Sequence, residues 1–172
     1  MTKRHHILFL FITFCLVSCN LKNPSTQQIP KTTEFHPIQA TSVVMIRGQL
    51  IYVPIYSSLP YAKNGHIPLN AVLSIRNTSN KESIIISKVE YFDTNGKSLK
   101  DFLTTSFRLG KMATKEFVIP SDDLSGGTGA NFIVRWDSEN AVSTPIIESI
   151  MYGTLGTNSF SFSSRGQEIE SH

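Results

Sequence analysis

The stretch Ser83–Phe92 (SIIISKVEYF), followed directly by Asp93–Gly96 (DTNG), decides the fold class of this chain. Its β-branched and aromatic side chains favour an extended strand. The Asn-Gly pair is typical of the tight type I′ turn that joins two antiparallel strands. Lys97–Leu103 then supplies the returning strand of the predicted hairpin. The sequence therefore predicts antiparallel β structure around residues 83–103.

Short β-type runs separated by turn residues continue on both sides of this hairpin. In Asn131–Trp136 the alternation predicts that Phe132, Val134 and Trp136 share one face. Pro54 lacks an N–H donor, so the run Leu50–Tyr56 is predicted to lie at a sheet edge or a bulge. The other predicted strands are Leu69–Arg76, Ser106–Leu109, Lys115–Ile119, Pro145–Tyr152 and Asn158–Ser164. The pattern predicts an immunoglobulin-like antiparallel β-sandwich of about seven to eight strands, with a small β-barrel as the alternative.

The N-terminus has the three parts of an export signal. Lys3 and Arg4 precede the apolar run Ile7–Val17 (ILFLFITFCLV), and Leu16–Cys19 (LVSC) closes that run. A helix of this length is roughly 16 Å long, about half of a bilayer's hydrocarbon core, which is typical of a cleaved signal. We expect residues 1–18 to be a lipoprotein signal peptide. Cys19 would then be the first residue of the mature chain and carry lipid, including an acyl group such as palmitate.

The segment after the signal has the composition of a tether. Asn20–Thr41 mixes Pro, Thr, Gln, Ser and Asn without a period of 2 or 3.6 residues. Because it cannot bury enough apolar surface to offset its ordering entropy, we expect residues 19–41 to be flexible. Residues 42–172 then form a single domain, exported from the cytoplasm and anchored at the cell envelope, on the periplasmic side or the cell surface.

The composition excludes several classes of function. The chain has 16 basic and 13 acidic side chains, and loss of Lys3 and Arg4 with the signal leaves 14 against 13. A chain this close to neutrality lacks the basic stripe that nucleic-acid binding requires. Cys19 would also be the only cysteine of the mature chain, so we expect neither disulfides nor thiolate chemistry.

Candidate catalytic and metal-binding residues are few. His66 is the one histidine inside the predicted fold, whereas tetrahedral zinc takes at least three protein ligands. Ser125–Gly129 (SGGTG) opens a strand instead of a helix, which indicates a tight loop and not a P-loop. Asp93, Asp122 and Asp123 could serve a hydrolase that uses carboxylates or a metal, although Asp-x-Asn-Gly is also ordinary turn chemistry. No catalytic constellation, metal site or cofactor is predicted.

Aromatic residues offer a possible binding surface. Tyr52 and Tyr56 share one face of a predicted strand, and Tyr61 follows shortly after. Such rings could stack on a sugar or grip a partner peptide. The alternative is that these rings cover the core, as we expect for Trp136.

Several stretches together resemble a bacterial family of exported proteins. They are Tyr52–Ser57 (YVPIYS), Leu73–Thr78 (LSIRNT), Tyr91–Lys97 (YFDTNGK), Ser125–Trp136 (SGGTGANFIVRW) and Phe162–Gly166 (FSSRG). The family is a domain of unknown function, number 3124 in that series, and the similarity covers roughly Gln49–Ile169. The resemblance implies an envelope protein, often lipid-anchored, with no assigned activity and no assigned site residue.

Three functional hypotheses follow. The first is a non-catalytic module that is held to the membrane by its lipid and binds another envelope protein or a cell-wall component. The second is an envelope hydrolase that uses carboxylates or a metal. The third is a ligand-carrying lipoprotein, which would require a cavity between the two sheets.

Overall fold

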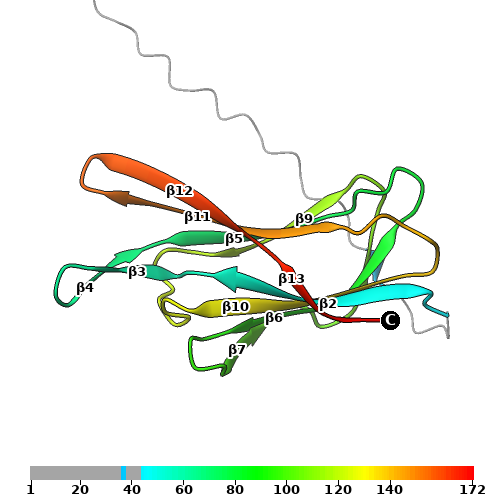
Figure 1. The fold of residues 1–172 in the computed structure, drawn as a ribbon, viewed down its shortest axis with the longest axis horizontal. Helices are drawn as coiled ribbons and strands as arrows, with labels where there is room; N and C mark the ends of the chain where they lie inside the picture. Colours follow the sequence, from blue (N-terminus) through cyan, green and yellow to red (C-terminus); the bar gives the residue numbers. More distant parts are fainter. Residues whose placement is uncertain (1–35, 38–43) are drawn as a thin grey trace, which may run out of the picture. The chain divides into compact units, whose positions relative to one another are not determined.

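The computed structural model describes residues 36–37 and 44–172, and every regular element in these ranges is a β-strand (Figure 1). The strands belong to one compact unit, Thr32–His172. Cys19, the predicted signal peptide and most of the predicted tether lie outside the described residues. The described part has no helix long and apolar enough to cross a membrane.

The larger sheet is built around three long antiparallel strands, in the order β6–β10–β2. They are β6 (Ile84–Phe92), β10 (Ala130–Ser138) and β2 (Arg47–Ile55). Shorter strands extend this sheet at both edges: β13 (Gln167–Ser171) beside β2, and β7 (Ser98–Asp101), β8 (Phe107–Leu109) and β1 (His36–Pro37) on the β6 side.

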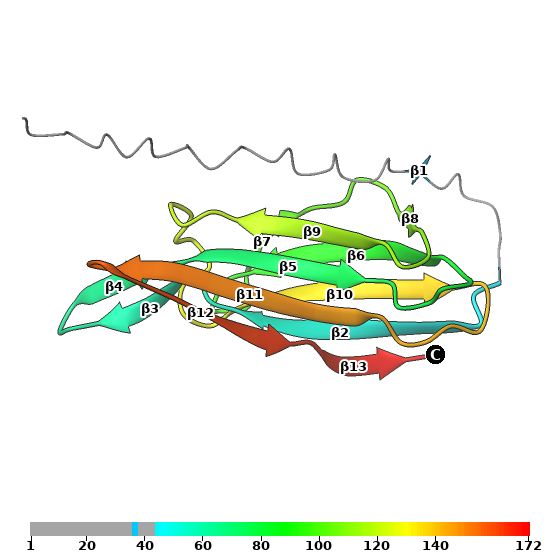
Figure 2. The same ribbon diagram turned by 90° about the horizontal axis from the view of Figure 1, so that it is seen from above.

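The smaller sheet has the order β12–β11–β5–β9 and is also antiparallel (Figure 2). Its strands are β12 (Asn158–Arg165), β11 (Ile146–Leu155), β5 (Asn70–Arg76) and β9 (Thr114–Ile119). A separate hairpin consists of β3 (Ser58–Tyr61) and β4 (Gly65–Pro68). The β3–β4 hairpin and the turn between β11 and β12 extend from the same end of the sandwich (Figures 1 and 2), which we call the hairpin end.

The predicted antiparallel β-sandwich is confirmed, and none of the described sheets closes into a barrel. The two sheets bury alternate residues of their long strands between them, as expected from the two-residue period of a strand. The larger sheet contributes Val53, Ile55, Phe132, Val134 and Trp136, and the smaller sheet contributes Ala71, Leu73, Ile75, Ile147 and Met151.

The sequence pattern missed β1, the β3–β4 hairpin and β13. Each of these elements is short, and much of β3, β4 and β13 is exposed, so these strands carry little apolar alternation. β1 lies inside the predicted tether, where His36–Pro37 pairs with β8. As a result, the described part has more strands than the seven to eight that the alternation predicts.

Pro54, which has no main-chain N–H, lies where the strand needs no N–H donor on its outer side. β13 pairs with β2 from Gln49 only as far as Tyr52. Beyond Tyr52 the outer side of β2 is therefore an edge, where an N–H group would have no ladder partner. The predicted edge position of Pro54 is confirmed.

The two long sides of the sandwich differ in how the chain connects the two sheets. On one side the chain passes directly from β12 of the smaller sheet to β13 of the larger sheet through Gly166, whose N–H donates to the Ile147 carbonyl at 2.9 Å. On the other side the turn 110–113 joins β8 to β9 at one end. The rest of β9 faces the connection between β7 and β8, and this open side forms the groove described below.

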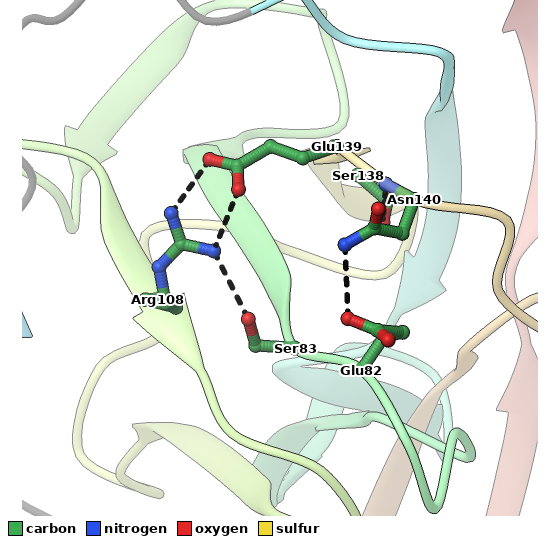
Figure 3. Close-up of polar contacts among 6 residues, drawn as sticks. All are labelled: Glu82, Ser83, Arg108, Ser138, Glu139 and Asn140. Carbon is green, nitrogen blue, oxygen red and sulfur yellow. Dashed lines mark hydrogen bonds and ion pairs between the residues drawn. The ribbon is translucent and has the colours of Figure 1, made fainter.

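A polar cluster ties the β10–β11 connection to the β5–β6 connection (Figure 3). The Arg108 guanidinium donates to the Glu139 carboxylate at 2.6 Å and to Ser83 Oγ at 3.0 Å. Asn140 Nδ2 donates to Glu82 Oε2 at 2.9 Å. Because a planar guanidinium can bond two oxygens of one carboxylate, this contact holds the two connections in a defined orientation.

The glycine-rich loop 125–129 closes over the buried ring of Tyr91. A Cβ atom on Gly126 would lie 1.8 Å from Tyr91 Oη and 2.8 Å from Ala130 Cβ. The Tyr91 ring is only 1% exposed and packs on Phe132 at 5.3 Å between centroids. We expect Gly126→Ala to lower the free energy of unfolding by about 3 kcal/mol, because neither neighbour can move without disturbing the core. Chemical denaturation measures the change.

Tyr91→Phe provides the matched control for Gly126→Ala. It removes the atom nearest to the added methyl group, and that hydroxyl makes no well-formed hydrogen bond to the described residues. Tyr91→Phe alone should therefore be close to neutral, and the double variant should recover part of the loss. If Gly126→Ala lowered the free energy of unfolding by the same amount in the wild-type protein and in the Tyr91→Phe variant, this packing would be contradicted.

Candidate functional site

A groove of about 460 Å³ lies on the open side of the sandwich, between the rims of the two sheets. Four parts of the chain line it: β1, the β7–β8 connection, β8 and β9. The lining residues are Pro37, Phe102, Leu103, Thr104, Thr105, Phe107, Lys115 and Phe117. Concave sites lined by aromatic side chains with a few polar groups are the usual form of a binding site.

Phe102 and Phe117 anchor the groove to the core. Phe102 follows β7, and its N–H still donates to the Val89 carbonyl of β6 at 2.9 Å. Its ring packs edge-to-face on Phe117 at 5.4 Å between centroids and lies 5.8 Å from Phe132. Phe117 belongs to β9 of the smaller sheet, so the pair joins the two rims. The aromatic lining is therefore held in place before any partner arrives.

Two lysines lie over the aromatic rings of the groove. Lys100 Nζ is 4.4 Å from the Phe102 ring centroid, and Lys115 Nζ is 5.4 Å from that of Phe117. Burial lowers the pKa of Lys115, and the negative charge of Glu116 partly opposes this shift. A partner with an apolar side chain beside a carboxylate would complement the rings and the Lys100 ammonium group.

β9 also offers main-chain partners along this side. Within the described part of the chain it pairs with β5 and with no other strand. Alternate N–H and C=O groups of Thr114–Ile119 therefore point away from the sheet, as in any edge strand. An edge strand beside an aromatic groove is an arrangement that can hold an extended peptide.

The three tyrosines of the predicted binding surface lie in different surroundings. Tyr52 is half-buried in the middle of β2, opposite Ile133 of β10. Tyr56 lies one residue beyond β2, packs against the core and contacts Phe162 edge-to-face at 5.7 Å between centroids. Tyr61 is exposed at the end of β3. No contact between these rings occurs among the described interactions, and none of them lines the groove.

The predicted hydrolase carboxylates mainly serve turns. Asp93 Oδ1 accepts the N–H groups of Asn95 and Lys97 at 2.8 and 2.9 Å. Asp123 Oδ1 accepts the Ser125 N–H at 3.0 Å, and Asp122 is exposed. Across residues 36–37 and 44–172, no three His, Cys, Asp or Glu side chains are grouped as metal ligands would be.

His66 lies beside the glycine-rich loop. It lines a shallow pocket of about 290 Å³ with Ser58, Thr94, Leu124, Gly127 and Thr128. Thr94 Oγ1 donates to the Gly126 carbonyl and accepts the Gly129 N–H, so this hydroxyl is used in holding the loop. Gly127 has a φ of 73°, a conformation that favours glycine. The loop interpretation of the SGGTG stretch is consistent with these contacts.

Sequence reasoning missed the groove, although a local signal exists. Lys100-Asp101-Phe102 and Lys115-Glu116-Phe117 both place lysine two residues before phenylalanine. In an extended chain, residues two apart point to the same side. Each triplet therefore predicts a lysine next to a ring, but only the folded sandwich shows that the two rings meet.

Of the comparisons with known proteins, the family model agrees with the resemblance that the sequence shows. No curated protein matches the chain. A solved structure titled "Crystal Structure of Thermotoga maritima 1070" is 13% identical, with 69% of this chain and 92% of that chain covered and a TM-score of 0.35. The family model described as "Protein of unknown function (DUF3124)" matches residues 48–169. The predicted family resemblance is confirmed: the chain belongs to the DUF3124 family of proteins of unknown function.

Proposed function

We propose that this protein is a non-catalytic binding module of the bacterial cell envelope, held to a membrane by lipid on Cys19. Its groove binds an extended segment of a partner protein. The observation that carries the proposal is the aromatic groove itself, which lies beside β9, an edge strand among the described residues.

The chemistry of the groove defines the partner segment. An apolar side chain of the partner fills the space lined by Phe102, Phe107 and Phe117. A neighbouring acidic residue lies near Lys100, whose ammonium group stands over the Phe102 ring. The partner main chain runs along β9 and adds a strand to the smaller sheet.

The anchor is supported by the sequence. A charged start, a short apolar run and the LVSC box together are typical of a lipoprotein signal. Anchoring raises the effective concentration of the groove near other membrane proteins, so a modest intrinsic affinity is sufficient. The exported domain faces the periplasm or the cell surface.

Photocrosslinking in intact envelopes tests the groove. A photoreactive residue replaces Thr104, which lines the groove, or Met112, which is 68% exposed in the turn 110–113 and outside the lining. We expect Thr104 to capture a defined envelope protein and Met112 to capture none. Lys100→Glu should reduce capture at Thr104 by roughly tenfold, since it replaces an attractive charge with a repulsive one.

Lys97→Glu is the matched control for Lys100→Glu, because it reverses an exposed lysine of the same hairpin that does not contact a groove ring. The groove would be refuted as the binding site if the probes at Thr104 and Met112 captured the partner equally well. It would also be refuted if Lys97→Glu and Lys100→Glu reduced capture to the same extent.

Cys19→Ala tests the anchor separately. The wild-type protein should fractionate with membranes and incorporate labelled palmitate, while Cys19→Ala should lose the label and be released. Unlabelled wild-type protein would refute the lipid anchor and leave the groove hypothesis intact.

A further inference from the structure

A second concave site lies at the hairpin end, away from the groove residues. It has a volume of about 250 Å³ and is enclosed by the β11–β12 hairpin and the start of β5. The residues that determine its chemistry are Asn70, Ser121, Tyr152, Thr154, Ser159 and Phe160. We call it the hairpin pocket.

Close backbone contact between two hairpins builds the hairpin pocket. A Cβ on Gly153 would lie 2.9 Å from Leu69 Cδ2 and 3.1 Å from the Pro68 carbonyl oxygen. Only a residue without a side chain lets β11 approach the end of β4 this closely. The approach places Tyr152 directly opposite Asn70 of β5 and Ser161 of β12 in the register of the sheet.

The polar groups of the hairpin pocket are held in a defined orientation. Asn70 Oδ1 accepts the Ser121 N–H at 3.1 Å, which identifies the oxygen end of the amide. Among the described residues the Asn70 amide nitrogen has no hydrogen-bond acceptor, so it can donate to a ligand. The hydroxyl groups of Ser121, Thr154 and Ser159 add further donors and acceptors around the same space.

The lining also carries exposed aromatic surface and no fixed charge. Tyr152 is 45% exposed although it lies within a strand. Phe160 also lines the pocket, beside Gly153 on the other face of the β11–β12 hairpin. No Asp, Glu, Lys, Arg or His is among the described lining residues. Because a charged ligand would lose hydration without gaining a partner of opposite charge, the pocket favours a neutral ligand.

We propose that the hairpin pocket binds one ring of a neutral saccharide. A pyranose has an apolar C–H face, which would stack on the Tyr152 ring, and a hydroxyl edge, which would bond Asn70 and the surrounding hydroxyl groups. The proposal does not depend on the partner-binding groove, since the two sites share no lining residue. With both sites active, the protein connects a membrane-bound partner to a glycan.

NMR titration of the isotopically labelled full-length chain in detergent tests the hairpin pocket. The probes are the trimer of N-acetylglucosamine, cellotriose and, as a charged control, galacturonic acid. We expect a neutral probe at millimolar concentration to shift the amide signals of Asn70, Ser121 and Tyr152, and galacturonic acid to leave them unchanged. The preference between the two neutral probes distinguishes an amino-sugar glycan from a glucan.

Tyr152→Ala and Tyr61→Ala form the matched pair of variants, because the two tyrosines are 45% and 50% exposed and neither supports the core. Tyr152→Ala should weaken saccharide binding by roughly tenfold through loss of ring stacking, and Tyr152→Phe should retain it. Tyr61→Ala should have no effect. The proposal is overturned if no neutral probe shifts these signals, if the charged probe binds equally well, or if both alanine variants weaken binding to the same extent.

Discussion

Trp136→Ala is expected to lower the free energy of unfolding by about 3–5 kcal/mol, which we regard as the largest effect of any single side chain in the domain. Trp136 is fully buried in β10, so its removal leaves a cavity between the sheets. Its indole Nε1 also donates to Gln49 Oε1 at 3.1 Å, and Gln49 in turn contacts Glu168 of β13. The substitution therefore removes core volume and a polar link to the edge of the sheet. Equilibrium denaturation with urea measures the loss.

Trp136→Phe separates the two contributions. It keeps most of the aromatic volume and removes the hydrogen bond, which leaves the buried Gln49 side chain without its donor. We expect a loss of about 1–3 kcal/mol for this variant, smaller than that of Trp136→Ala. A Trp136 fluorescence spectrum that is red-shifted and readily quenched by iodide in the native protein would contradict the buried position.

Asn77→Ala is expected to destabilise the fold by about 3 kcal/mol through lost hydrogen bonds. Asn77 is 2% exposed and follows β5. Its Nδ2 donates to the Glu82 and Gly110 carbonyls at 2.8 and 2.9 Å, and its Oδ1 accepts the Ser79 N–H at 3.0 Å. One side chain thus holds the β5–β6 connection against the turn between β8 and β9. Alanine would remove these bonds from the buried Ser79 N–H and from the partly buried Glu82 and Gly110 carbonyls.

The neighbouring Asn80 provides the control for Asn77→Ala. Asn80 has the same side chain in the same connection but is exposed. Asn80→Ala should therefore change the free energy of unfolding by less than about 0.5 kcal/mol. Similar losses at the two positions, measured by thermal or chemical denaturation, would show that the network around Asn77 does not stabilise the connection.

The two binding proposals rest on different physical features of the sandwich. The groove exists because the rims of the two sheets are joined at the turn 110–113 and Phe102 and Phe117 line the space along the rest of β9. The hairpin pocket exists because Gly153 lets two hairpins touch. Asn77 and Trp136 stabilise the framework between these sites, so variants at either position test stability without altering a proposed contact.

Much of the β structure could be predicted from local pattern. The strands β5 and β10 alternate in part between buried and less buried residues, since one face of each is buried, whereas β2 and β6 are marked by runs of β-branched and aromatic residues. The turn after β6 lies where the sequence predicts it, but the predicted type I′ geometry is wrong. Gly96 has a φ of 79°, whereas Asn95 is not among the described residues with a positive φ. The Gly96 N–H donates to the Asp93 carbonyl at 3.0 Å, as in a type I turn that is followed by a left-handed glycine. The exposed β3–β4 hairpin and β13 carry no such alternation and were missed for that reason.

Only single features of the candidate sites could be predicted from the sequence. The lysine and phenylalanine of each Lys-acid-Phe triplet lie on one side of the chain, and this follows from strand geometry alone. Tyr52, Tyr56 and Tyr61, in contrast, are close in sequence but have separate surroundings in the fold. Nothing local in the sequence indicates a site at Tyr152, because Asn70 and Ser121 lie far from it along the chain.

The amino-acid sequence by itself determined the β class, the main strands, the faces of those strands that are buried, and the membership of residues 48–169 in the family. These properties follow from side-chain alternation and turn chemistry, which act over a few residues. Only the tertiary structure decided which described strands lie at an edge and which distant residues become neighbours, such as the rings of Phe102 and Phe117, and Tyr152 and Asn70 on adjacent strands. The physical reason is that strand order and sheet packing arise from long-range contacts, whose partners no local pattern specifies.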